Sequence, residues 1–306
     1  MEFRQYYDSI YWSKRTGISQ FFQNKAEVLD LMIQYAEEKQ NAYTWRRALM
    51  EKAWIKKDRP YYKVFPAIIP MLVNFRLDVP CSALLDIPVE PIELRLPRHD
   101  PKRLFTWTDI TGEECTIEGM LIGIQKMPTR EHSDTLTKGL VICFDPGERD
   151  ESGAPIISIK YFPLNTDSTV AENFELLKEH ESWREGLQVP KHIVDNIVKL
   201  ATCVCLIGSD PSIISPDILA KDEKRWDTAT EQEREAMIAM ARRRGKNGWS
   251  IGYNMEVSPH YRSAHLARVW TGTGRTTPKI VLRKGTVVHR QKLTTLPSGY
   301  DSQDNG

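Results

Sequence analysis

The chain has 306 residues and a net charge of +1, with 41% hydrophobic and 27% charged residues. This length allows one large body or two domains, and this composition excludes a protein that is disordered throughout. Apolar runs such as Cys203–Ile207 are far shorter than the roughly 20 residues of a membrane-spanning helix, and residues 1–8 lack the apolar stretch of a secretion signal. We therefore expect a cytoplasmic protein with no membrane partner.

The first 57 residues show the apolar spacing of helices. Val28, Leu29 and Met32 follow Asn24, a residue type that often caps a helix, and a second periodic stretch follows a break at Asn41. The sequence therefore predicts two packed helices in this region.

Residues 59–101 are rich in proline, which interrupts helices, so we expect an extended connection with short strands. The pattern then changes to β-branched and aromatic runs separated by turn residues. Strands are expected over Leu104–Trp107, Thr116–Gln125, Gly139–Phe144 and Ile156–Tyr161. An antiparallel meander of these four strands is predicted.

Helical patterns return over Thr169–Glu181 and Pro190–Leu200, and the short apolar run Cys203–Ile207 is interpreted as a buried strand. The pattern Thr230-x-x-Glu233 is typical of a capping box, which starts a helix that should end at Gly245. Further strands are expected over Trp249–Val257, His265–Trp270, Lys279–Leu282 and Thr286–Gln291.

Because helices and strands occur in separate blocks, the sequence predicts an α+β fold: a helical N-terminal region packed on a β-rich body with a mainly antiparallel sheet. The expected divisions are a helical region over 1–58, a β-rich domain with helices over 59–210, and a helix with a basic β module over 211–306.

The five cysteines are an odd number, and most have apolar neighbours, which favours reduced, buried thiols over a disulfide framework. A single residue separates Cys203 from Cys205, too few for a zinc knuckle. His260 and His265 have a spacing found in zinc sites, but Glu256 is the one carboxylate nearby in the sequence. We expect neither a metal ion nor another cofactor.

Positive charge is concentrated in residues 242–290, called the basic segment below. It contains eight Arg and three Lys but one acid, Glu256, so it carries +10 and the rest of the chain −9. Such a concentration is typical of a protein that meets phosphates or an acidic partner. Arginine can bind phosphate oxygens through two N–H groups at once. Phosphate contacts are expected from Lys246, Arg262, Arg268, Arg275, Arg283 and Arg290, gathered on one face.

Three histidines of the basic segment, His260, His265 and His289, are candidates for acid–base catalysis, because imidazole exchanges protons near neutral pH. A Gly-x-Gly turn before Arg275 could bring backbone N–H groups close to an anion. These features would suit metal-free cleavage of a phosphodiester. Simpler explanations stay open: arginines at the end of a helix offset its dipole by about 0.3–1 kcal/mol each, and histidines also occur as ordinary turn or strand residues.

The string Pro259-His260-x-Arg262-x-x-His265, followed by Gly272-x-Gly274-Arg275, resembles a recurrent C-terminal module of uncharacterised bacterial and mobile-element proteins. The resemblance covers about the last fifth of the chain and implies that the module recurs as a unit with no known activity. The doubled basic pair that usually follows the first histidine is replaced here by Ser263-Ala264.

Two functions from different classes are open. The first is a nucleic-acid-binding protein of bacterial or phage origin, with RNA favoured over DNA, which could also act as a metal-independent ribonuclease of the toxin or defence-effector type. The second is a non-catalytic interaction or assembly protein whose basic segment docks on an acidic protein surface, such as that of another copy in a homo-oligomer. The sequence leaves open whether the protein is an enzyme.

Overall fold

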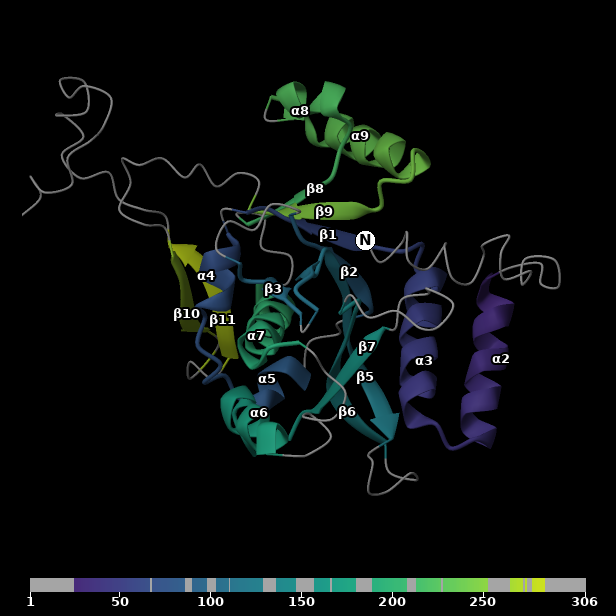
Figure 1. The fold of residues 1–306 in the computed structure, drawn as a ribbon. Helices are drawn as coiled ribbons and strands as arrows, with labels where there is room; N and C mark the ends of the chain where they lie inside the picture. The colour runs from purple at the N-terminus through teal and green to yellow at the C-terminus, as the bar shows by residue number, and fades with distance from the viewer. Residues whose placement is uncertain are drawn as a thin grey trace, which may run out of the picture.

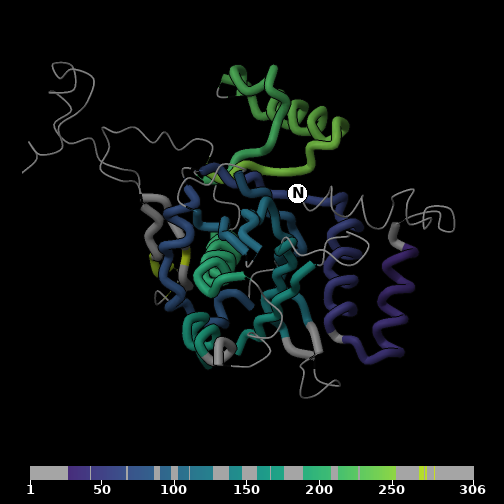
Figure 2. The backbone as a smooth tube through the Cα atoms, viewed as in Figure 1, coloured from purple at the N-terminus to yellow at the C-terminus, as the bar shows by residue number. Residues whose placement is uncertain are grey.

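The computed structural model is drawn as a ribbon in Figure 1 and as a tube in Figure 2. It describes residues 25–66, 68–85, 90–97, 103–109, 111–128, 136–146, 157–165, 167–179, 189–207, 213–226, 228–252, 265–271, 273 and 277–283. The helices in these ranges are α2 (Lys25–Glu38), α3 (Ala42–Lys56), α4 (Ile69–Val73), α5 (Cys81–Leu85), α6 (Val170–Glu179), α7 (Lys191–Ile207), α8 (Ala220–Trp226) and α9 (Glu231–Arg243). The strands are β1 (Tyr61–Val64), β2 (Ile92–Arg95), β3 (Thr106–Thr108), β4 (Glu114–Thr116), β5 (Gly119–Pro128), β6 (Leu136–Phe144), β7 (Ser158–Pro163), β8 (Ile214–Pro216), β9 (Gly248–Ile251), β10 (His265–Thr271) and β11 (Thr277–Arg283). No helix within the described ranges is long and apolar enough to cross a lipid bilayer.

A seven-stranded sheet with strand order β7-β6-β5-β2-β1-β9-β8 lies at the centre of the molecule. Neighbouring strands are antiparallel from β7 to β2, whereas β1 runs parallel to both β2 and β9, and β8 is antiparallel to β9. The predicted α+β class with a mainly antiparallel sheet is confirmed. Because β8 and β9 follow residue 210, the sheet contains strands from both sides of that expected domain boundary.

The N-terminal helices α2 and α3 form the packed pair that the sequence predicts. The side chain of Asn41 caps α3, accepting a hydrogen bond from the backbone N–H of Thr44 at 3.0 Å. Val28 and Leu29 of α2 are buried in one apolar cluster with Ala48 of α3. Local capping and apolar spacing therefore determine this part of the fold.

Helices pack on both faces of the sheet, but unequally. On one face, helices α4 to α7 and the sheet form a large apolar core that includes Leu94 and Ile142. On the other face, α3 covers β5, β6 and β7, where Met50 and Trp54 share a second apolar cluster with Leu121. The part of this second face over β2, β1, β9 and β8 carries polar residues instead.

The predicted meander is correct for three of its four strands, which are neighbours in the sheet as β5, β6 and β7. The fourth, expected over Leu104–Trp107, corresponds to β3, which pairs with β4 in a separate two-stranded sheet. Its expected place beside β5 is taken by β2, from the proline-rich connection. The prolines Pro91 and Pro97 flank β2 and do not interrupt it, so a four-residue strand fits between them.

The apolar run Cys203–Ile207, expected as a strand, is the last part of helix α7, so that prediction was wrong. Every residue from Leu200 to Ile207 is buried. The run therefore has no exposed polar positions whose spacing would distinguish a helix from a strand. The predicted burial of Cys203 and Cys205 is confirmed, and both thiols are free.

Helices α8 and α9 form a hairpin that stands beyond the β8 edge of the sheet. The predicted capping box is present, with the Thr230 backbone N–H donating to the Glu233 carboxylate at 2.8 Å and the Glu233 N–H to the Thr230 hydroxyl at 3.4 Å. Gly245 follows the helix with a φ of 77°, a backbone conformation that glycine adopts without strain. The helix thus begins and ends where its sequence signals predict.

Candidate functional site

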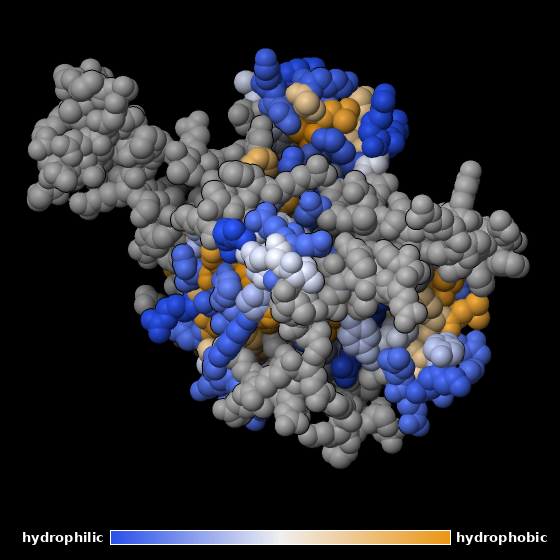
Figure 3. All heavy atoms as spheres, in the orientation of Figure 1, coloured by the Kyte–Doolittle hydropathy of each residue, from blue (hydrophilic) through white to orange (hydrophobic). Residues whose placement is uncertain are grey.

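The basic segment begins with three exposed arginines, Arg242, Arg243 and Arg244, at the C-terminal end of α9. Within the ranges that the structure describes, no acidic side chain forms an ion pair with any of them. In the space-filling view, hydrophilic residues of the α8–α9 hairpin that carries them surround a small hydrophobic area (Figure 3). The three side chains therefore present uncompensated positive charge at the end of a capped helix.

Lys246, expected to contact phosphate, instead has partners inside the protein. Its Nζ lies 3.0 Å from an Asp217 carboxylate oxygen and donates a 2.8 Å hydrogen bond to the backbone carbonyl of Ile218. These contacts join the start of β9 to the segment that follows β8. Their geometry favours a structural task for Lys246, and its expected phosphate contact stays a prediction.

Three of the remaining candidates lie in the two-stranded ribbon of β10 and β11. The register places His265 opposite Arg283 and Arg268 opposite Ile280. Opposite residues of an antiparallel pair share a face, and successive residues alternate between faces. Positions 265 and 283 are therefore on one face of the ribbon and position 268 is on the other, so these three residues do not form a single row.

The other predicted site residues, His260, Arg262, Arg275, His289 and Arg290, lie outside the part of the chain that the structure describes. The expected convergence of His260, Arg262, His265 and Arg275 on one ligand, and the catalytic roles of the histidines, stay predictions.

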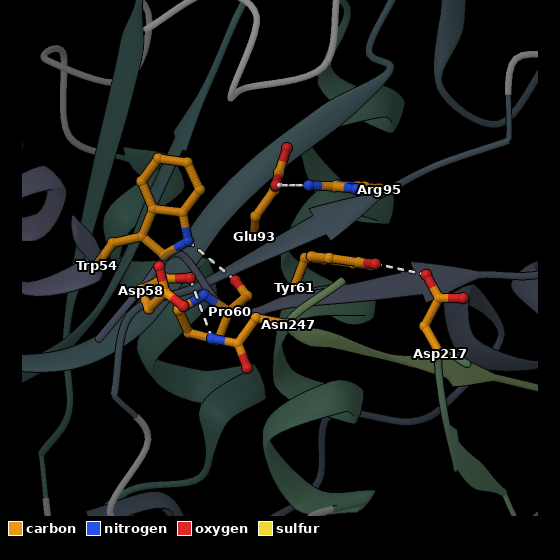
Figure 4. A network of polar contacts seen from close by, with 8 residues as sticks. All are labelled: Trp54, Asp58, Pro60, Tyr61, Glu93, Arg95, Asp217 and Asn247. Carbon is orange, nitrogen blue, oxygen red and sulfur yellow. Dashed lines mark hydrogen bonds and ion pairs between the residues drawn. The ribbon is translucent and has the colours of Figure 1, made fainter. Parts of the chain in front are cut away.

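A second cluster of charged and polar side chains, which sequence reasoning missed, lies over β2, β1 and β9 on the face of the sheet that carries α3 (Figure 4). The Tyr61 hydroxyl on β1 donates to the carboxylate of Asp217, which also pairs with Lys246. Burial and this carboxylate raise the pKa of the Tyr61 phenol above its usual range. Tyr61 therefore stays protonated at neutral pH and acts as the donor.

Arg95 lies over the same tyrosine. Its guanidinium carbon is 3.5 Å from the centroid of the Tyr61 ring, and its Nε and Nη2 donate to one oxygen of Glu93 at 3.0 and 2.9 Å. The Glu93 side chain has no exposed surface, whereas that of Arg95 is 18% exposed. A stacked ring and a charged acceptor together fix the plane of a guanidinium group.

Strand register explains why these groups share one face. Tyr61 is paired with both Glu93 and Gly248, and Lys63 with both Arg95 and Ser250. We call this set of six residues the polar strip. Gly248 provides the space that Tyr61 occupies, since a Cβ there would lie only 2.5 Å from ring atoms of Tyr61. The ring is thus placed between the backbone of β9 and the guanidinium of Arg95.

A sequence signal for the polar strip exists in the alternation of β2, where Ile92 and Leu94 are apolar and Glu93 and Arg95 are charged. The many nearby prolines led to this region being interpreted as a connection. The contacts of Tyr61 with its partners could not be predicted from the sequence. Asp217 and Lys246 are distant in sequence and come close to Tyr61 because β1 pairs with β9 and β9 pairs with β8.

Within the described residues, no group of three or more His, Cys, Asp and Glu side chains is placed to hold a metal ion. The polar strip and Arg242–Arg244 present cations and hydrogen-bond donors.

No family model matches the sequence, and no curated protein matches it. Among solved structures, the crystal structure of AcrVA2 is similar, with a TM-score of 0.48 and 15% sequence identity over 86% of this chain and 83% of that chain. A similarity of this degree gives no information about function, which we therefore infer from the residues of this chain.

Proposed function

We propose that this is a nucleic-acid-binding protein, of bacterial or phage origin, which favours RNA over DNA and binds through its basic segment. The observation that carries the proposal is the cluster Arg242–Arg244: it is exposed, lies at the end of a capped helix, and forms no ion pair with a described acid. Neutralising phosphates with such residues, and releasing their counterions, supplies most of the affinity of non-specific nucleic-acid binding.

The ribbon of β10 and β11 adds support for a single-stranded ligand. Trp270 is 40% exposed and, two residues from Arg268, falls on the same face of β10. Exposed aromatic rings stack on unpaired bases, while a neighbouring arginine contacts the backbone phosphate. This pairing of residue types favours single-stranded RNA over duplex DNA as the ligand.

The proposal is tested by fluorescence anisotropy with single-stranded RNA, single-stranded DNA and duplex DNA of equal length at several salt concentrations. We expect RNA to bind most tightly, with affinity falling as salt rises. Replacing Arg242, Arg243 and Arg244 by Gln should lower the slope of log K against log salt by about 2, since each phosphate contact with a single strand contributes about 0.7.

The matched control replaces three exposed lysines outside the basic segment, Lys39, Lys126 and Lys191, by Gln. It removes the same charge and should leave the slope almost unchanged. Equal effects of the two triple variants, or no binding of any nucleic acid by the parent protein, would refute the proposal. Self-association at low salt without nucleic acid would then favour docking on an acidic protein surface.

Cleavage is a second, separable part of the proposal, in which His260, His265 or His289 transfers protons during metal-independent hydrolysis of RNA. We expect the parent protein to cleave labelled RNA in the presence of EDTA. Replacing a catalytic histidine by Ala should abolish cleavage and spare binding. If the purified protein binds RNA and leaves it intact, the catalytic part fails and the binding part stands.

A further inference from the structure

The polar strip holds an arginine whose orientation is fixed by a chain of contacts from β1, β2 and the segments that follow β8 and precede β9. Glu93 fixes one side of the Arg95 guanidinium, Tyr61 lies beneath its plane, and Asp217 and Lys246 hold Tyr61 in place. Figure 4 shows Glu93, Arg95, Tyr61 and Asp217 following one another across the sheet. Fixing an arginine in this way removes most of the entropy cost of its next contact.

Only part of the donor capacity of Arg95 is used. A guanidinium has five N–H groups, and Glu93 accepts from Nε and Nη2 through a single oxygen. Nη1 has no hydrogen-bond or ion-pair partner among the described residues, and part of the side chain is exposed. Donor groups of a partly exposed side chain therefore remain after the internal contacts are made.

A second cation lies beside it. Lys63 is the register partner of Arg95 on the adjacent strand, is exposed, and forms no ion pair within the described ranges. The charge of Lys246 is balanced by Asp217 and that of Arg95 by Glu93, so the charge of Lys63 is left uncompensated. The Lys63 Nζ lies 5.4 Å from the centroid of the Phe65 ring. The strip thus combines a planar guanidinium with an exposed ammonium group on the adjacent strand.

We infer that Arg95 and Lys63 form a binding site for a phosphate group, separate from the basic segment. A tetrahedral oxyanion accepts hydrogen bonds from the remaining guanidinium N–H groups, and the Lys63 ammonium supplies the balancing charge. The phosphate could come from a nucleic-acid backbone or from a free nucleotide. This inference does not rest on the proposed function, because Arg95 and Lys63 both lie outside residues 242–290.

The test follows the Nε–H resonance of Arg95 by NMR in the full-length protein labelled with 15N-arginine. The resonance is assigned by its loss in the variant Arg95→Lys, whose fold is checked by circular dichroism. Inorganic phosphate, AMP and single-stranded RNA are titrated separately. We expect a saturable shift of this resonance, with at least a several-fold weaker Kd in Lys63→Gln, a change at an exposed position that should leave the fold intact.

A shift with phosphate or AMP would support a site for free phosphorylated ligands, and a shift with RNA alone would support a backbone phosphate. Absence of a shift with all three probes up to ~10 mM, in the range of the weakest specific binding, would overturn the inference. So would an equal response in the parent protein and in Lys63→Gln. The variant lacking Arg242–Arg244 should keep the Arg95 response, so failure of RNA binding by the basic segment is recognised separately.

Discussion

Over β5, β6 and β7, one face of the sheet is covered by the apolar side chains of α3, whereas over β2, β1 and β9 the same face carries charged and hydroxyl groups. Trp54 on the covered half and Glu93 on the polar half are both completely buried. Trp54, on α3, buries its ring against apolar residues of the sheet, whereas Glu93 is buried by its own ion pair and its neighbours. Apolar burial between helix and sheet supplies stability, while burial within a polar network mainly fixes orientation.

This comparison predicts that the largest loss of stability follows truncation on the covered half. Trp54→Ala should lower the free energy of unfolding by about 3–5 kcal/mol, because it removes a fully buried ring and leaves a cavity. Urea denaturation followed by circular dichroism measures this change. Trp54→Phe, which loses the hydrogen bond from the indole N–H to the Pro60 carbonyl but keeps a ring, should cost clearly less. Equal costs would mean that the hydrogen bond, and not the apolar packing, dominates.

On the polar half, the most sensitive position should be Gly248. Gly248→Ala places a Cβ 2.5 Å from Tyr61 ring atoms, so the ring and the stacked Arg95 must move. Crowding of this kind typically costs about 1–3 kcal/mol. In a Tyr61→Ala background the same change should cost little, which a double-mutant cycle measures. An unchanged cost in that background would contradict the described placement of the ring.

A smaller, pH-dependent effect is expected from Glu51, a buried acid on the apolar half. Its carboxylate lies 3.4 Å from Nε of Arg47 and has no hydrogen bond within the described residues. Burial raises its pKa from 4.5 to about 7. The folded protein therefore holds this proton more tightly than the unfolded chain, so the stability contribution present below pH 4.5 is lost as the pH rises through 7.

Glu51→Gln should flatten this pH dependence and make the protein more stable than the parent above pH 7, by about 1 kcal/mol, since the loss of attraction to Arg47 offsets part of the gain. Thermal unfolding between pH 4.5 and 8 provides the measurement. If the variant and the parent show parallel pH profiles, Glu51 is ionised in the folded protein, and the contrast between the two halves of the face is weaker than described.

The parts of the fold that sequence reasoning predicted are those with local signals. The Asn41 cap, the box formed by Thr230 and Glu233 and the glycine at 245 each act within one turn of helix, so they can be recognised without knowledge of the fold. The end of α7 could not be assigned in this way, because burial on all sides leaves no periodic polar positions.

The candidate site was less predictable for a different reason. Charge density alone indicated the basic segment, and it could not distinguish the exposed Arg242–Arg244, which were explained by the helix dipole, from Lys246, whose acidic partner is brought near by the pairing of β8 with β9. The polar strip depends on strand neighbours as well. Arg95 becomes a candidate only once β1 is known to lie between β2 and β9.

That position of β1 also affects how the protein is made. Residues 65–247 must all leave the ribosome before β9 can pair with β1. Until then, the edge of β1 that later pairs with β9 has unpaired backbone N–H and C=O groups while the rest of the sheet assembles. An open strand edge invites pairing with other chains, and charged side chains on the strand discourage it. Lys63 places a charged side chain on that strand. Replacing it with a neutral residue would therefore be expected to increase aggregation during synthesis, even where the finished fold tolerates the change.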